Sequence, residues 1–211
     1  PFNFPFALAG GPIAAALVAG NTVVFKTASA TAWSGRLLMD AFDAADLPPG
    51  VLNLVCGDGA EVGQALMHAP ALAGATFTGS HAVGMALLRH FAAGARPRPL
   101  IAEMGGKNAA IVSRHADLDR AATGIVRSAF GLQGQKCSAC SRVYVQREVA
   151  DALRQRLVER TQAIAVGDPT LQAHWMGPVI DAGAVARFRK ATAELDATGR
   201  LHCGGGVLDE G

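Results

Sequence analysis

The stretch ATFTGSHAVGMALLRHFAAGARPRPLIAE, residues 75–103, decides the fold class of this 211-residue chain. It begins with a β-branched and aromatic run at residues 75–78, which is typical of a buried strand. A glycine turn follows, then a helical pattern over residues 81–93 and a second strand at residues 100–103. Strands that alternate with such helices predict an α/β fold with a mainly parallel sheet, covered on both faces, whose ligands bind at the strand ends.

The same alternation extends in both directions along the chain. The further expected strands are residues 22–25, 51–55, 109–112 and 142–145, and the further expected helices are residues 31–45, 60–68, 117–130 and 149–164. Two glycines interrupt the pattern at Gly105-Gly106. We therefore expect two domains, residues 1–105 and residues 106–211.

The composition excludes several classes of partner. Half of the residues are apolar and 17% are charged, which is typical of a globular protein. The net charge of +2 comes without a basic run, so we expect no nucleic-acid partner. The longest apolar stretch, residues 4–20, contains prolines and glycines and is shorter than the ~20 residues of a membrane helix. We expect it to be buried within protein, with no membrane partner.

The cysteines and the first residue bear on the cellular context. Cys56, Cys137, Cys140 and Cys203 are too few and too irregularly spaced for the disulfide framework of a small secreted domain. We therefore expect the cytoplasm, with the mitochondrial matrix as the alternative if the source is eukaryotic. Because the chain begins with Pro and has no leader segment, we expect it to be an internal piece of a longer protein.

The loop at residues 131–142 carries the candidate nucleophile, Cys137. A thiol is largely un-ionised at neutral pH, so a neighbouring cation such as Lys136 favours its reaction. The alternative is a buried, inert cysteine, since free Cys is among the most buried residue types. With Cys140 it also spells C-x-x-C, which indicates a dithiol redox module or half of a zinc site. The six histidines show no ligand spacing, so we expect no metal and a packing role for Cys140.

Two further polar residues stand where an oxidation at a thiol needs them. Glu103 ends an apolar strand and is a candidate general base for water. Asn3 lies between aromatics and prolines, and its amide is a candidate donor to an oxyanion, together with the N–H of Cys137. The alternatives are a strand-end carboxylate that is solvated or paired with Lys107, and an ordinary loop asparagine.

The cofactor candidates lie at strand ends in the first half of the chain. Gly79 and Ser80, with Gly84 following, occupy a strand-to-helix junction where N–H groups could bind a pyrophosphate. Lys26 follows a strand and could reach ribose or phosphate. The junction is not the G-x-G-x-x-G fingerprint, and a tight turn with a solvated lysine explains these residues equally well.

In this order, five motifs resemble the aldehyde dehydrogenase superfamily: PFNFP (residues 1–5), GNTVVFK (20–26), FTGS (77–80), EMGGK (103–107) and GQKC (134–137). The resemblance implies a partial Rossmann-like cofactor domain at residues 1–105 and a partial catalytic α/β domain at residues 106–211. It further implies a homo-oligomeric parent that oxidises a small-molecule aldehyde through a cysteine thioester, with NAD as hydride acceptor. The implied site residues are Cys137 as nucleophile, Glu103 as base, Asn3 as oxyanion donor, and Lys26, Ser29, Gly79, Ser80 and Gly84 at the cofactor.

Within the superfamily, GQKCSACSR at residues 134–142 is most similar to the 1-pyrroline-5-carboxylate dehydrogenase group. That similarity implies oxidation of L-glutamate γ-semialdehyde to glutamate in proline or arginine catabolism, with Lys136 and Ser138 binding the substrate carboxylate. A broad-specificity aldehyde dehydrogenase, a dithiol module and a non-catalytic relative are the alternatives.

Two departures from the superfamily pattern carry expectations of their own. Ser29 stands where the superfamily usually has an acidic residue, and its lack of charge favours acceptance of NADP beside NAD. The superfamily's other cofactor, substrate and oligomerisation segments lie outside these residues. We therefore expect residues 1–211 alone to expose apolar faces and to be poorly soluble or inactive.

Overall fold

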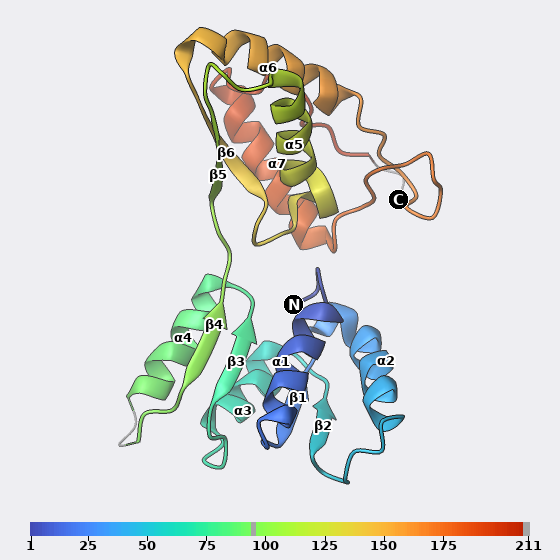
Figure 1. Ribbon diagram of the computed structural model, residues 1–211, viewed down its shortest axis with the longest axis vertical. Helices are drawn as coiled ribbons and strands as arrows, with labels where there is room; N and C mark the ends of the chain where they lie inside the picture. The colour runs from blue at the N-terminus through green and yellow to red at the C-terminus, as the bar shows by residue number, and fades with distance from the viewer. Residues whose placement is uncertain (94–95, 209–211) are drawn as a thin grey trace. The chain divides into compact units, whose positions relative to one another are not determined.

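The computed structural model describes residues 1–93 and 96–208, and it has two compact units, Pro1–Gly105 and Gly106–Gly211 (Figure 1). Both units are built from parallel strand pairs with helices, so the chain has an α/β fold. In the part of the chain that the structure describes, no helix is both long and apolar enough to cross a membrane.

The first unit contains four strands in two parallel pairs. Its elements are α1 (Ala7–Val18), β1 (Val23–Lys26), η1 (Ser29–Thr31), α2 (Ala32–Asp43), β2 (Leu52–Val55), η2 (Gly59–Gly63), α3 (Gln64–His68), β3 (Ala75–Thr78), α4 (His81–Ala92) and β4 (Leu100–Glu103). Strand β1 pairs with β2 so that Lys26 is opposite Val55, and β3 pairs with β4 so that Thr78 is opposite Glu103. The polar residues Lys26 and Glu103 therefore stand at the carboxyl ends of their strand pairs.

Arg98 joins the helices of the first unit to the start of β4. Its guanidinium donates to the carbonyls of Met67, Ala69 and Leu72 at 3.0–3.2 Å. The same group lies 4.1 Å from the ring centre of Phe91, which is 1% exposed. These contacts give a partner to the Met67 carbonyl in the last turn of α3 and to two carbonyls of the turn that follows the helix.

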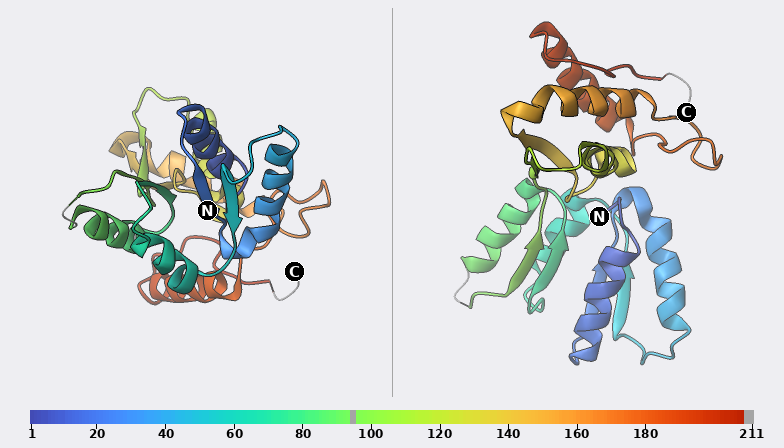
Figure 2. Two further views of the ribbon diagram at one scale, coloured as in Figure 1. Left: turned by 90° about the horizontal axis from the view of Figure 1, so that it is seen from below. Right: turned by 45° about the horizontal axis from the view of Figure 1, so that its top comes forward.

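The second unit is built on one parallel pair, β5 (Asn108–Val112) and β6 (Cys140–Val145). The connection between them runs through α5 (Leu118–Phe130) and η3 (Gly131–Gly134), and α6 (Arg147–Gln162) and α7 (Ala182–Ala197) follow. Val112, Ala122, Ile125 and Leu153 form a core that packs α5 and α6 against the strand pair. Two further views of the ribbon are given in Figure 2. Asp117 caps α5 by accepting from the N–H groups of Asp119 and Arg120.

Some sequence-based expectations were wrong. Most of the stretch 4–20 forms helix α1 (Ala7–Val18), of which only Ile13 is buried, whereas Val18 is 91% exposed. The strands form three separate two-stranded sheets among the described residues, and these are not covered on both faces. Ile101 on β4 is 62% exposed and Ile111 on β5 is 84% exposed. Helix α7 was not expected, and it buries none of its residues.

Candidate active site

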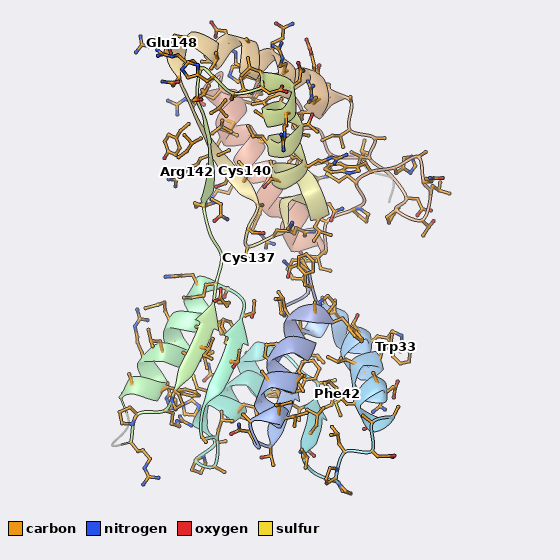
Figure 3. The ribbon with its side chains drawn as sticks, in the orientation of Figure 1. Trp33, Phe42, Cys137, Cys140, Arg142 and Glu148 are labelled. Atoms are coloured by element: carbon orange, nitrogen blue, oxygen red, sulfur yellow. The ribbon has the colours of Figure 1, made fainter. Side chains whose placement is uncertain are left out.

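Cys137 lies on an exposed loop of the second unit, between η3 and β6 (Figure 3). We call residues 135–139 the cysteine loop. The loop turns back on itself because the Ala139 N–H donates to the Lys136 carbonyl at 3.3 Å. The alternative of a buried, inert Cys137 is therefore wrong, since its side chain is exposed to solvent.

Asn108, at the start of β5, forms hydrogen bonds from its side chain to the backbone of the cysteine loop. Its side-chain Nδ2 donates to the Cys137 carbonyl at 2.7 Å and to the Ala139 carbonyl at 3.4 Å. Gly106 approaches the same place, because a Cβ added there would lie 3.0 Å from the Cys137 carbonyl oxygen. The second glycine of the Gly105-Gly106 pair thus allows a close approach of two backbones, which the sequence did not reveal.

A left-handed turn leads into the cysteine loop. Leu132, Gln133 and Gly134 have φ values of 53°, 57° and 69°. Non-glycine residues rarely adopt this conformation, so it persists where surrounding contacts hold it. One such contact comes from Gln135, whose Oε1 accepts from the N–H of Ile180 at 3.0 Å while its Nε2 donates to the Leu132 carbonyl. The loop is thereby tied to the chain that follows α6.

Cys140 faces a different environment from Cys137. It is half-buried and packs against the core of the second unit, and its N–H donates to Ser128 Oγ at 3.2 Å. Its Sγ lies 3.3 Å from the Arg142 carbonyl. The packing role expected for Cys140 is confirmed. Among residues 1–93 and 96–208, no group of three His, Cys, Asp or Glu side chains is arranged to hold a metal.

In the first unit, Lys26 and Ser29 lie at the carboxyl end of β1. The Lys26 Nζ donates to the Thr27 carbonyl at 3.0 Å, and Ser29 Oγ donates to the Gly57 carbonyl, beyond the end of β2, at 3.2 Å. Thr27 between them is 3% exposed, which anchors this turn. An ammonium and a hydroxyl at the same strand end are suited to phosphate and ribose oxygens.

The start of α4 gathers Gly79, Ser80 and Gly84. Ser80 caps the helix, and its Oγ accepts from the Val83 N–H at 3.4 Å. Gly79 has no room for a side chain, because a Cβ would lie 2.5 Å from the ring of Phe77. The first-turn N–H groups of this 12-residue helix are the kind of donor that binds a pyrophosphate. The donor set of the first unit thus fits a dinucleotide.

Gly84 has a packing role that the sequence did not indicate. It is buried, and a Cβ there would lie 2.6 Å from the sulfur of Met104. Its N–H already donates to the Ser80 carbonyl at 3.0 Å. Gly84 therefore shapes the contact beneath the helix start and does not present its own N–H to a ligand.

Asn3 and Glu103 are the two remaining predicted site residues of the first unit. Asn3 precedes α1, and its Oδ1 accepts from the Phe4 N–H at 3.1 Å. Glu103 is exposed at the end of β4, and its carbonyl accepts from the Gly79 N–H at 3.0 Å.

Most of the predicted residues thus lie at three places, two strand ends in the first unit and one loop in the second. Lys26 and Ser29 share one strand end of the first unit, and Glu103 shares another with Gly79 and Ser80. Lys136, Cys137 and Ser138 are consecutive in the cysteine loop of the second unit. The sequence did not reveal Asn108, because a single Asn beside a lysine matches no catalytic pattern.

A comparison with models of known protein families identifies the family of this chain. All 211 residues match the model of the aldehyde dehydrogenase family. The chain belongs to this family. The resemblance drawn from the five motifs is therefore confirmed, and the α/β fold is that of an aldehyde dehydrogenase.

Individual aldehyde dehydrogenases agree with the family match. The chain is 47% identical over 210 residues to 1-pyrroline-5-carboxylate dehydrogenase of Geobacillus thermodenitrificans, covering 97% of this chain and 41% of that protein. The crystal structure of 1-pyrroline-5-carboxylate dehydrogenase from Thermus with bound NAD is 35% identical, with a TM-score of 0.94 over 99% of this chain and 41% of the other. Lactaldehyde dehydrogenase from Escherichia coli is 37% identical, with a TM-score of 0.92 over 99% of this chain and 44% of the other. The chain spans about 41% of the length of the curated relatives it matches.

Proposed function

We propose that the full-length protein oxidises an aldehyde to a carboxylic acid through a thioester on Cys137. The observation that carries the proposal is an exposed thiol on a loop fixed by side-chain hydrogen bonds, in a chain of the aldehyde dehydrogenase family. A fixed, accessible thiol suits nucleophilic attack, because the reacting atoms start close to their productive geometry.

The proposed reaction begins with attack of the Cys137 thiolate on the aldehyde carbon. A carbon–sulfur bond forms, and the carbonyl oxygen becomes an oxyanion that accepts hydrogen bonds from the Asn3 amide and the Cys137 N–H. Removal of one such donor typically costs on the order of 3 kcal/mol of barrier. The role of Asn3 and its cooperation with Cys137 are proposals that rest on the order of the family motifs.

The same proposal assigns the cofactor to the first unit. Lys26, Ser29 and Ser80, with the first-turn N–H groups of α4, would hold the phosphates and ribose of NAD. Gly79, whose own N–H donates to the Glu103 carbonyl, would let the phosphates approach the backbone closely. When bound, the nicotinamide would accept the hydride that leaves the substrate carbon. Glu103 then takes a proton from water, the water oxygen attacks the thioester, and the acid departs as the Cys137 sulfur is released.

For the substrate, we propose L-glutamate γ-semialdehyde. Lys136 offers a cation and Ser138 a hydroxyl on either side of Cys137, which suits a substrate that carries a carboxylate. The relatives named 1-pyrroline-5-carboxylate dehydrogenase support this choice. The likeness to lactaldehyde dehydrogenase keeps broader aldehyde specificity as the second candidate. We further propose that the full-length protein is a homo-oligomer and that it resides in the cytoplasm; the four free cysteines support only the choice of compartment.

A substrate comparison tests the proposal. The full-length protein is assayed for NAD reduction with glutamate semialdehyde and with simple aliphatic aldehydes, beside its Cys137→Ser variant. We expect the semialdehyde to be the better substrate and the variant to lose turnover with both. Equal or faster turnover of aliphatic aldehydes would overturn the substrate assignment, and undiminished activity of Cys137→Ser would overturn the mechanism.

A further inference from the structure

We propose that Asn108 is a positioning residue that sets the direction of the Cys137 side chain; this inference deepens the proposed function and rests on it for its catalytic consequence. The starting observation is the pair of hydrogen bonds from Asn108 Nδ2 to the carbonyls of Cys137 and Ala139, at 2.7 Å and 3.4 Å. Both acceptors are backbone carbonyls, so Asn108 acts through the backbone of the cysteine loop.

The two peptide planes on either side of Cys137 are each held by one hydrogen bond. On the preceding side, the Lys136 carbonyl accepts from the Ala139 N–H at 3.3 Å. In a planar trans peptide the carbonyl and the N–H point in opposite directions, so this bond also directs the Cys137 N–H away from the turn. On the following side, the Cys137 carbonyl accepts from Asn108. With both planes held, the Cα–Cβ bond of Cys137 leaves the loop in one direction.

Asn108 is itself held in place by the strand pair. The register of β5 against β6 is irregular at this point, because Asn108 is opposite Cys140 while Ala109 is opposite Arg142. Ser141, the residue skipped by that irregularity, donates through its Oγ to the Asn108 carbonyl at 3.4 Å. A β-bulge of this kind redirects a side chain next to a functional loop. Here the side chain it directs is the Asn108 amide.

The Cys137 carbonyl oxygen lies in a narrow slot between the Gly106 backbone and the Asn108 amide. A Cβ added at Gly106 would lie 3.0 Å from that carbonyl oxygen and 3.1 Å from the Asn108 Nδ2. The oxygen therefore sits between a glycine backbone and an amide donor. Because the slot accepts the carbonyl in one orientation, loss of the donor leaves the Cys137–Ser138 peptide free to rotate.

The experiment compares two Asn108 variants with a matched control in the full-length protein. Asn108→Asp keeps the shape of the side chain but removes the N–H donor, whereas Asn108→Gln keeps the amide. The control is Asn53→Asp, because Asn53 Nδ2 also donates to a backbone carbonyl, that of Gly50, at the same 2.7 Å. Thermal melting of each variant is measured to check that the variant folds.

Two readouts are measured, the rate of Cys137 alkylation by iodoacetamide, and kcat and KM with aldehyde and NAD. We expect Asn108→Asp to slow alkylation about fivefold and to lower kcat about tenfold with little change in KM, since a lost hydrogen bond to the nucleophile's own peptide misplaces it. Asn108→Gln should recover most of both rates, and Asn53→Asp should match the wild type.

Unchanged alkylation in Asn108→Asp would overturn the inference, as would an equal loss in Asn53→Asp, which would indicate a general structural effect. Failure of the Gln variant to recover either rate would also contradict it. Alkylation needs neither aldehyde nor cofactor. If the wild type does not oxidise aldehydes, the proposed function fails, while the alkylation comparison still decides the role of Asn108.

Discussion

At the scale of single residues, Ser29 bears on the choice of cofactor. Its hydroxyl donates to the Gly57 carbonyl beside the end of β1, so this strand end carries no negative charge from residue 29. An acidic residue at such a position binds the ribose hydroxyls of NAD and repels a 2′-phosphate. We expect the full-length protein to reduce NADP at a measurable rate, and Ser29→Glu to lower kcat/KM for NADP about tenfold by charge repulsion. Comparison of both cofactors checks this, and a wild type without NADP activity would refute it.

The two neighbouring glycines provide a second test at this scale. Gly106→Ala places a methyl group 3.0 Å from the Cys137 carbonyl, whereas nothing lies within 4 Å of a methyl at Gly105. We expect Gly106→Ala to destabilise the protein by about 1–2 kcal/mol through overpacking and to slow alkylation of Cys137, with Gly105→Ala as the control. Denaturant unfolding and thiol labelling give the two quantities. Equal unfolding free energies and equal alkylation rates in the two variants would show that Gly106 is not needed for the close approach to the Cys137 carbonyl.

Prediction of a site residue from sequence is most direct where that residue carries its own chemical signal. Cys137 has a reactive side chain within a family motif, and the structure leaves that side chain exposed. Asn108 has no such signal, because its partner Cys137 is 29 positions away and the contact depends on a bulge between β5 and β6. Contacts of that kind arise from the tertiary fold and leave no local pattern.

At the scale of elements, the helix pair α5 and α6 is linked by Asp119. Its Oδ1 accepts from Arg160 at 2.7 Å and lies 3.4 Å from Arg156. The hydrogen bond from Arg160, with the charge of Arg156, holds the pKa of Asp119 below its ordinary value of 3.8. A lowered folded-state pKa contributes stability above the unfolded value, and that contribution is lost as the pH falls through the folded value.

The corresponding prediction concerns stability in acid. We expect the wild type to lose melting temperature as the pH falls below about 4, and Asp119→Asn to lose less over the same range because its ionic contribution is already absent. The control is Asp151→Asn, whose carboxylate pairs with Arg154 within α6 alone. Melting curves at several pH values measure the effect, and parallel acid slopes for Asp119→Asn and the wild type would contradict it.

The elements that the sequence predicted best have simple local signals. Residues 75–78 and 100–103 were expected as strands and form β3 and β4 with those bounds. Helix α1 was missed because Gly10, Gly11 and Pro12 disfavour a helix, although the surrounding alanines favour one. Helix α7 was missed because it buries no residue, so no apolar periodicity marks it.

At the scale of the whole molecule, apolar side chains remain exposed on the strand pairs. Ile101 on β4, Ile111 on β5 and Tyr144 on β6 are 62%, 84% and 56% exposed. Exposed apolar surface of this kind favours association. We expect residues 1–211 expressed alone to aggregate, and Ile101→Thr with Ile111→Thr to raise the soluble yield. Sedimentation of the soluble fraction measures the degree of aggregation. A wild-type 211-residue chain that is soluble and monodisperse would contradict the expectation.

Acylation of Cys137 is the step on which the proposed mechanism depends, and mass spectrometry can detect it. The full-length Glu103→Gln variant is mixed with aldehyde and NAD, quenched in acid and digested with trypsin, which releases residues 137–142. Because the proposed base is absent, mass spectrometry should find the acyl group accumulated on Cys137, with Cys140 in the same peptide unmodified. An unmodified Cys137 while aldehyde oxidation proceeds, or the acyl group on Cys140, would contradict the account.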